Sequence, residues 1–535
     1  MSGPTVANAP SVSKPQMLRQ NSDVESSTDE KSTIDIEHVP VNDDPRQWSR
    51  ARKTTTLCIV SLATMMSALA SNIQNPSNSL IEEDLHATSS QISWTLAAFL
   101  VVQGNFPLIW SAASEIRGRK PVYLVASALF MAGSAALALS KTIEMMIGMR
   151  VLQAAGSCAV MAISAATLAD IYDTHERGTT MGIFFAAPLL GPALGPIIGG
   201  SLSQAFNWRA SFYFLLICEV LIFTSFLVLF KDTYRRERSL TYCSALQRLI
   251  TSKVRVQSSD VSVIAGHESS KDMTPVKDAE KQLQQPNVPD NISVTSSTPT
   301  MDDVRLSIRD INPFPPYFQI LSRKNNALIL IANGLVFGFS YCLSYTCART
   351  LANAYDLDAF SIGLVLLCLG VGSIAGSVIS GRWSDRVLAK MMEANGGKWY
   401  AEMRLESSTL AMLWLPPSVV GYAWACEKHA HVAVICILLV IIGFSSIWMY
   451  TNTLAYLVDA NPGRSCTAVA TNSSFRGCLA FVSILVAVPL QNALGDGGLY
   501  TAWAGVLIVT ELLVLLVLHK GESWRKESEE RELKY

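Results

Sequence analysis

The stretch GTTMGIFFAAPLLGPALGPIIGG, residues 178–200, decides the fold class. Small residues recur every four positions at Ala187, Gly191, Gly195 and Gly199, and prolines keep the same step one position later. In a water-soluble helix each proline would remove a backbone donor and clash with the preceding turn. Membrane helices tolerate prolines because packed neighbours satisfy the freed carbonyl groups, and regularly spaced small residues let another helix approach closely. The stretch therefore predicts a bent, tightly packed transmembrane helix.

The composition of the whole chain points the same way. Of its 535 residues, 50% are hydrophobic and only 16% are charged, which excludes an ordinary soluble protein of this size. The net charge is -1, so no nucleic-acid partner is expected. The eleven cysteines include no CxxC pair, and the histidines fall in loops, tails or segment ends. We therefore predict neither a disulfide framework nor a metal site, and no cofactor.

Apolar segments long enough to cross a hydrocarbon core of about 30 Å fall into two sets of six. The predicted spans are 54–75, 92–112, 121–139, 145–169, 180–202 and 210–230, then 326–347, 361–380, 409–425, 432–457, 468–490 and 501–519. The chain then divides into a disordered cytosolic tail over 1–52, a six-helix bundle over 53–231, a cytosolic linker over 232–323, a second bundle over 324–520 and a cytosolic tail over 521–535.

The distribution of Lys and Arg predicts the orientation. Basic residues gather before the first span and after the second, at Arg50, Lys53 and Arg117, whereas the loop 76–91 contains neither Lys nor Arg. Because short cytoplasmic loops carry the excess of positive charge, both termini and the linker are expected in the cytosol.

The two halves of the chain also resemble each other. SAASEIRGRK at 111–120 follows the second span, and GRWSDR at 381–386 follows the eighth. Parallel six-helix repeats are typical of major facilitator transporters. Together with RVLQAAG at 150–156 and YLVDANPGRS at 456–465, these motifs resemble fungal major facilitators of the drug:proton antiporter type, in the branch with multidrug, itaconate and citrate exporters. The resemblance implies an all-α membrane fold of twelve helices in two six-helix pseudo-repeats, and a monomer driven by the proton gradient.

The resemblance also implies a cytoplasmic gate in the loop after the second span. Its acid and basic positions are Glu115, Arg119 and Lys120, with Asp385 and Arg386 as counterparts in the second half. A carboxylate facing guanidinium groups makes a charge-assisted latch that must break for the cytosolic side to open. The alternative for the basic residues is simple positive-inside topology.

Arginines inside apolar segments are candidates for substrate binding or coupling. Arg150 shares a helical face with Gln153, and Arg476 lies about ten residues into the eleventh span, roughly 15 Å deep. An intramembrane arginine is costly unless it faces a partner or a cavity. A structural ion pair for Arg150, and bonds to backbone carbonyls and Asn472 for Arg476, are the alternatives. The resemblance adds cavity-lining candidates on helices one, seven and ten: Asn72, Gln74, Tyr341, Tyr345 and Asn452.

Two further groups of residues remain. Glu219 and Glu511 lie at similar depths in the sixth and twelfth spans and are possible proton carriers, although a protonated glutamate beside lipid is the alternative. The resemblance identifies the fifth span as the helix that marks exporters, and we predict that it forms a close seam between the halves. Its candidate positions are Gly191, Gly195, Pro196, Gly199 and Gly200.

The combined pattern predicts a transporter and not an enzyme, since the sequence contains no phosphate loop, metal cluster or Ser/His/Asp set in a plausible place. The first hypothesis is export of itaconate- or citrate-like anions by proton antiport at the plasma membrane, because Arg150 and Arg476 favour an anionic small molecule. The alternative is a multidrug:proton antiporter, and a remote one is a nutrient sensor that moves no solute.

Overall fold

The computed structural model describes residues 41, 43–172, 174–238, 242, 246, 314–396, 400–461 and 464–534. Every regular element within these ranges is a helix. The tail predicted over 1–52 and the linker predicted over 232–323 lie mostly outside the described residues.

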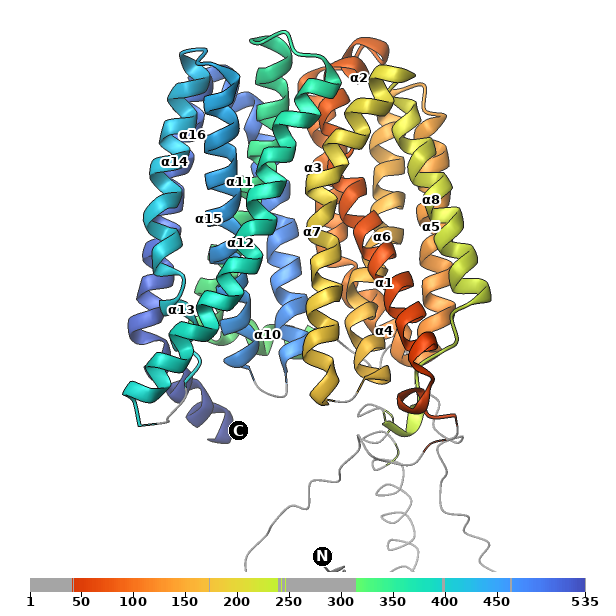
Figure 1. Cartoon of the computed structure of the whole chain (residues 1–535), viewed down its shortest axis with the longest axis vertical. Helices are drawn as coiled ribbons and strands as arrows, with labels where there is room; N and C mark the ends of the chain where they lie inside the picture. The colour runs from red at the N-terminus through yellow and green to blue at the C-terminus, as the bar shows by residue number, and fades with distance from the viewer. Residues whose placement is uncertain are drawn as a thin grey trace, which may run out of the picture.

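The first half of the described chain is a bundle of long helices that run along the long axis of the molecule (Figure 1). They are α1 (Arg50–Asn72), α3 (Ser89–Asn105), α4 (Pro107–Arg117), α5 (Arg119–Ala138), α6 (Ile143–Ile171), α7 (Thr174–Ala205) and α8 (Arg209–Val228). The short segments η2 (Pro45–Gln47), η3 (Asn75–Ser77), α2 (Asn78–Asp84) and η4 (Arg236–Arg238) complete this half.

Local sequence explains where these helices begin and bend. Thr88 and Gln91 form a reciprocal capping box that starts α3, since each side chain bonds the other residue's backbone N–H. Pro107 cannot donate a backbone hydrogen bond, and α3 and α4 meet there at 42°. Gly118 separates α4 from α5 at φ 89°, a conformation that glycine adopts without strain.

The second half repeats the arrangement. Its helices are α10 (Phe314–Ser322), α11 (Lys324–Asn353), α12 (Ala359–Ala394), α13 (Met403–Glu406), α14 (Thr409–Glu427), α15 (Val432–Asp459) and α16 (Ser465–Lys534). Figure 1 shows this half beside the first, with the start of α1 and the end of α16 at the same end of the bundle.

The helix α16 is a hairpin of two arms. Gly495 lies inside it at φ 69° and ψ 179°, outside the helical region. A straight helix of 70 residues would be about 105 Å long. Yet Arg464 Nη1, just before the helix, lies 3.0 Å from Glu532 Oε2, near its end. The chain therefore turns back at Gly495 and crosses the bundle twice.

The predicted all-α membrane fold is confirmed. Nine helices of the described chain are long and apolar enough to span a membrane, and the bent α3–α4 pair makes a tenth. Counting the two arms of α16 separately and adding α14, which at 19 residues is about 28 Å long, gives the twelve predicted crossings.

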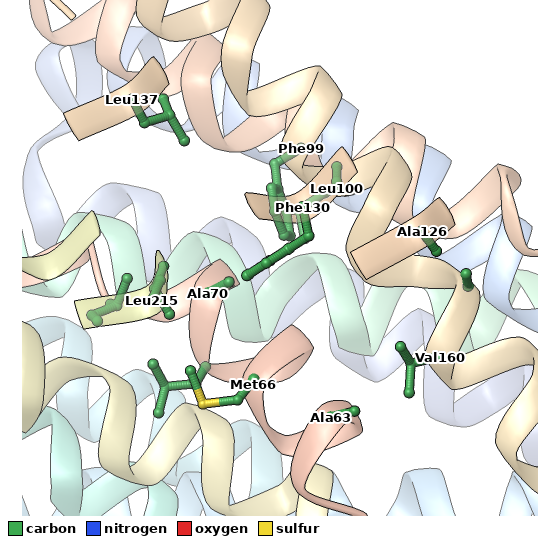
Figure 2. Packing of buried hydrophobic residues seen from close by; sticks show 14 of the residues in the cluster. Ala63, Met66, Ala70, Phe99, Leu100, Ala126, Phe130, Leu137, Val160 and Leu215 are labelled. Carbon is green, nitrogen blue, oxygen red and sulfur yellow. The ribbon is translucent and has the colours of Figure 1, made fainter. Parts of the chain in front are cut away.

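Two apolar clusters form the main core of the described chain, and the first of them extends across the boundary between the halves. Figure 2 shows part of the first cluster, with Met66, Phe99, Phe130, Val160 and Leu215 among its labelled side chains, and the cluster also includes Tyr345 of α11 and Ala480, Ile484 and Val488 of α16. A second cluster joins α11, α12, α14, α15 and α16. The second cluster lies within the second half, whereas the first joins the two halves where α11 and α16 pack against it.

Two seams made of small residues join the halves. At one, α7 lies beside α12 (Figure 1), and a Cβ on Gly363 would lie 2.5 Å from Pro196 O. At the other, Gly104 of α3 and Gly477 of α16 face each other so closely that a Cβ on either would lie 2.7 Å from the other's Cα. The backbones touch directly at both seams.

Candidate functional site

The positions predicted for the fifth span face two different helices. Cβ atoms on Gly191, Gly195 and Gly199 would press on α1, within the same half. Gly200 instead faces α12, where a Cβ would lie 2.2 Å from Ala359 O. The helix α7 therefore lies between a partner from its own half and one from the other half, and its three prolines do not interrupt it.

Arg150 is at the centre of a closed polar network. Its side chain is fully buried and donates to Gln153 Oε1 at 2.8 Å, to Ala70 O at 3.0 Å and, through Nε, to Gln74 Oε1 at 3.0 Å. Gln153 continues to Ser134 at 2.9 Å. The network joins α1, α5 and α6, and it brings together the predicted residues Arg150, Gln153 and Gln74.

Arg476 lies in a different environment. Its guanidinium carbon is 3.9 Å from the centre of the Phe337 ring and 4.8 Å from that of Tyr450, and Nη1 donates to the Tyr450 hydroxyl at 2.7 Å. Its Nε has no acceptor among the described residues. One turn earlier on the same helix, Asn472 Nδ2 also lacks an acceptor there, while its Oδ1 accepts from Asn333 at 3.0 Å.

Neither intramembrane arginine forms an ion pair with a carboxylate in the part of the chain that the structure describes. Arg150 is fully buried among uncharged acceptors and the rings of Phe99 and Phe212, whereas Arg476 is half-buried and its Nε has no acceptor among the described residues. An arginine fork with unused donors is suited to a carboxylate or phosphate group.

Polar contacts tie α11 to the first half. Tyr345 Oη donates to Ser89 O at 3.0 Å and accepts from Ser93 Oγ at 3.2 Å. Tyr341 Oη lies 3.0 Å from Ser71 Oγ, which accepts from Asn72 Nδ2 at 2.8 Å. Three of the predicted cavity residues, Asn72, Tyr341 and Tyr345, thus belong to a contact between the halves. Asn452 is buried, and its Nδ2 has no acceptor in the described residues.

On the cytosolic side of the first half, Arg119 is held by its own half. Its Nη1 donates to Ser114 Oγ at 2.5 Å, and its Nε lies 3.4 Å from Asp170 Oδ2 at the end of α6. Lys120 donates to Leu227 O at 2.9 Å, so it caps the end of α8. Glu115 contributes an electrostatic attraction to Arg119.

The second half repeats this cluster. Arg404 lies 3.1 Å from Asp459 Oδ2 at the end of α15 and 3.4 Å from Asp385 Oδ1 on α12. Asp385 and Arg386 are both exposed. Sequence reasoning missed Asp170, Arg404 and Asp459, although the acid before the loop in YLVDANPGRS was a usable signal for Asp459.

The two intramembrane glutamates lie apart from these clusters. Glu219 of α8 is buried beside Ser127 of α5. Glu511 lies in the second arm of α16, and its Oε1 has no donor among the described residues. Neither glutamate forms an ion pair with Arg150 or Arg476 among the described residues.

Comparison with known proteins gives a consistent family. Residues 60–394 match the family model of the Major Facilitator Superfamily. The chain is 26% identical to the MFS antiporter QDR3 of Candida albicans, with 91% of this chain and 80% of the relative covered. It is 27% identical to citrate exporter 1 of Aspergillus niger over 90% of this chain and 89% of the relative, and 23% identical to quinidine resistance protein 3 of Saccharomyces cerevisiae over 91% and 85%.

Two solved structures share the fold. The human organic anion transporter MFSD10 aligns with a TM-score of 0.56 at 16% identity, covering 86% of this chain and 99% of that one. The xylose transporter XylE of E. coli, in a partially occluded inward-open conformation, aligns with a TM-score of 0.58 at 12% identity, covering 87% and 97%. The predicted family and fold are confirmed, and the chain belongs to the Major Facilitator Superfamily as a multi-pass membrane transporter of small molecules, not an enzyme.

Proposed function

We propose that the protein exports small organic acids of the itaconate or citrate type from the cell, across the plasma membrane and in exchange for protons. The observation that carries the proposal is Arg476, a half-buried cation with aromatic walls, an unused Nε donor and no carboxylate partner in the described chain. The orphan Nδ2 of Asn472 lies one turn away and supplies a second donor.

The chemistry favours a carboxylate at this place. Burying a cation without an anion is costly, so a bound carboxylate both neutralises Arg476 and accepts from donors that otherwise lack partners. A relative named for citrate export supports this substrate class. In this proposal Arg150 organises Gln74 and Gln153 and does not touch the solute while its network is closed.

Proton coupling completes the proposal. Glu219 and Glu511 are the buried carboxylates within the described spans that could carry the proton. A relative with antiporter in its name supports exchange rather than uniport. The monomer is the proposed transporting unit, since the two halves already pack against each other within one chain.

Uptake of labelled citrate and itaconate into inside-out plasma-membrane vesicles that contain the full-length protein tests the proposal. Parent vesicles should accumulate one of the acids, and a protonophore should reduce uptake. Arg476→Ala should lower uptake about tenfold or more, the loss expected for hydrogen bonds to a charged group, with Arg476→Lys intermediate. Arg531→Ala, which removes an exposed arginine from the end of α16, is the matched control. Absence of uptake of both acids by the parent would overturn the proposal.

A multidrug antiporter is the second candidate. The Phe337 ring lies against Arg476 and its centre is 4.7 Å from that of Tyr341, and such an aromatic surface suits a planar amphipathic solute. Relatives with drug antiport or quinidine resistance in their names support it. Quinidine uptake into the same vesicles separates the two candidates, because the multidrug candidate predicts quinidine uptake that persists in Arg476→Ala.

A further inference from the structure

A short segment after α8 lies against the cytosolic gate and is not part of any motif found in the sequence. We call residues Lys231–Arg238 the strap. It contains η4 and, in Figure 1, is the yellow-green segment beside the start of α1 at the lower end of the bundle. Its contacts run in two directions: toward the gate turn between α4 and α5, and toward the segment that precedes α1.

The first contact is between Asp232 and the gate turn. Asp232 Oδ1 accepts from the backbone N–H of Arg119 at 3.1 Å and from that of Tyr234 at 3.0 Å. Its Oδ2 occupies the space that a side chain on Gly118 would need, 2.3 Å from the position of a Cβ. Gly118 has φ 89°, so both the conformation and the space require glycine. The carboxylate therefore holds the turn through the backbone.

The next two strap residues enclose the Arg119 side chain. Thr233 is buried, and its Oγ1 donates to Asp170 Oδ2 at 3.2 Å, the same oxygen that lies 3.4 Å from Arg119 Nε. The Tyr234 ring centre is 5.1 Å from the Arg119 guanidinium carbon. The strap thus acts on Arg119 in three ways. Asp232 accepts from the Arg119 backbone N–H, Thr233 bonds Asp170, the ion-pair partner of Arg119, and the Tyr234 ring lies near the Arg119 guanidinium.

The opposite side of the strap is tied to the segment before α1. Arg238 Nη2 lies 2.6 Å from Asp44 Oδ2, and Arg235 Nη2 lies 3.1 Å from Asp43 Oδ2, which Lys231 also contacts. The hydrogen bond from Arg238 lowers the pKa of Asp44 below its ordinary value. A carboxyl with a lowered pKa stabilises the folded contact at every pH above its unfolded pKa, so these pairs persist at cytosolic pH.

We propose that Asp232 is a positioning residue of the cytosolic gate and that Asp43 and Asp44 keep the strap in place. The proposal rests on the gate role proposed for Arg119, but it does not depend on which solute is carried. When the gate opens, the α4–α5 turn must move relative to the other half, and the strap makes the segment before α1 move with that turn. The strap thereby links the gate to the two cytosolic parts of the chain that flank it.

Hydrogen exchange of the full-length protein in lipid nanodiscs, without any solute, tests the proposal directly. In Asp232→Ala the Arg119 amide loses its acceptor, so peptides over 114–120 should exchange about five- to tenfold faster, the change expected for one lost hydrogen bond. Asp232→Asn keeps an oxygen at the Oδ1 position and should stay near the parent. Glu522→Gln, which removes an exposed acid elsewhere on the cytosolic side, is the control. Unchanged exchange over 114–120 in Asp232→Ala would overturn the proposal, and so would equal effects of Ala and Asn.

A second variant keeps the test decisive if Asp232→Ala loosens the whole first half. The double change Asp43→Asn and Asp44→Asn touches no gate residue, and it should raise exchange over 231–238 and, to a smaller extent, over 114–120. Exchange that stays at the parent value in both segments would overturn the proposal. For any solute that the vesicles take up, Asp232→Ala should change the maximal rate and leave KM unaltered, because the gate controls a conformational step. A failure of citrate and itaconate uptake alone would count only against the proposed substrate.

Discussion

At the residue scale, Arg150 and Arg476 lie in similar apolar segments but have different hydrogen-bonding environments. Arg150 donates to Gln74, Gln153 and the backbone of Ala70, and its cost of burial is offset by neutral acceptors. Arg476 lies beside the rings of Phe337 and Tyr450, and its Nε has no acceptor in the described chain. The sequence placed both in spans, but it could not separate them, because the acceptors of Arg150 come from helices that are distant along the chain.

This difference predicts unequal losses of stability for the same substitution at the two positions. Arg150→Leu should lower the free energy of unfolding by about 3 kcal/mol or more, since Gln74, Gln153 and Ala70 O each lose a buried donor and such losses cost about 1–3 kcal/mol apiece. Arg476→Leu should change stability by less than about 1 kcal/mol, since it leaves only the Tyr450 hydroxyl without a donor. Thermal unfolding of the solubilised full-length variants measures both. Equal destabilisation by the two changes would contradict this assignment.

The partners of the gate residues could not be identified from the sequence alone. Arg119 was predicted from its motif, whereas Asp170 and Asp232 are found only from the fold, because each lies at the end of another span where an acid is common. In the second half the missed residue Arg404 takes the place of Arg119, and it lies in a short helix that no apolar pattern marks.

At the scale of elements, hydropathy located the spans but not their ends or partners. The helix α12 continues to Ala394, beyond the predicted end at Ser380, because its cytosolic extension is polar on one side and carries no apolar signal. The pattern of α7 predicted a close helix contact. The pattern did not show that Gly191, Gly195 and Gly199 face α1 while Gly200 faces α12. Close packing against either helix requires small residues, so the pattern is the same for both partners.

The close contact between α7 and α12 predicts that adding a side chain at Gly363 lowers stability. Gly363→Ala would place a Cβ 2.5 Å from Pro196 O, so the two backbones must separate, and we expect a loss of about 1–3 kcal/mol in stability. Gly148→Ala, in a helix with nothing within 4 Å of the new Cβ, should be neutral or stabilising by up to about 1 kcal/mol. Thermal unfolding of both variants in the same detergent is the measurement. A Gly363→Ala variant as stable as Gly148→Ala would show that the seam tolerates side chains.

At the scale of the molecule, composition and loop charges were enough to predict the membrane spans and their orientation, because few architectures satisfy every backbone polar group inside a bilayer. The two-bundle transporter was predicted from the internal repeat and from the motifs that resemble a known family. The state of the transporter was not predictable. Tyr345 and Tyr341 bond across the halves toward the outer side, while Arg119 and Arg404 bond within their own halves on the cytosolic side. This distribution is expected for an inward-facing conformation, which depends on a balance between the halves and not on any local pattern.

Thiol labelling tests the orientation and the state together. A cysteine at Ser111, exposed on α4, should react with a membrane-impermeant reagent in inside-out vesicles and not in intact cells. A cysteine at Glu83, exposed in the outer loop, should show the opposite. All eleven native cysteines are replaced by Ser in the background, since Cys243 lies in the predicted cytosolic linker. Labelling of both positions from one side would contradict the twelve-span topology.

The glycine seams carry a consequence for how this scaffold diversifies. Where Gly104 meets Gly477, the moving surfaces are main chain, so the only demand on these positions is the absence of a side chain. A backbone contact of this kind does not depend on which solute the transporter carries. Substitutions around Arg476 can therefore alter solute binding without altering the backbone contact between Gly104 and Gly477. The names of two relatives, a citrate exporter at 27% identity to this chain and a quinidine resistance protein at 23%, differ in the way that such independence would allow.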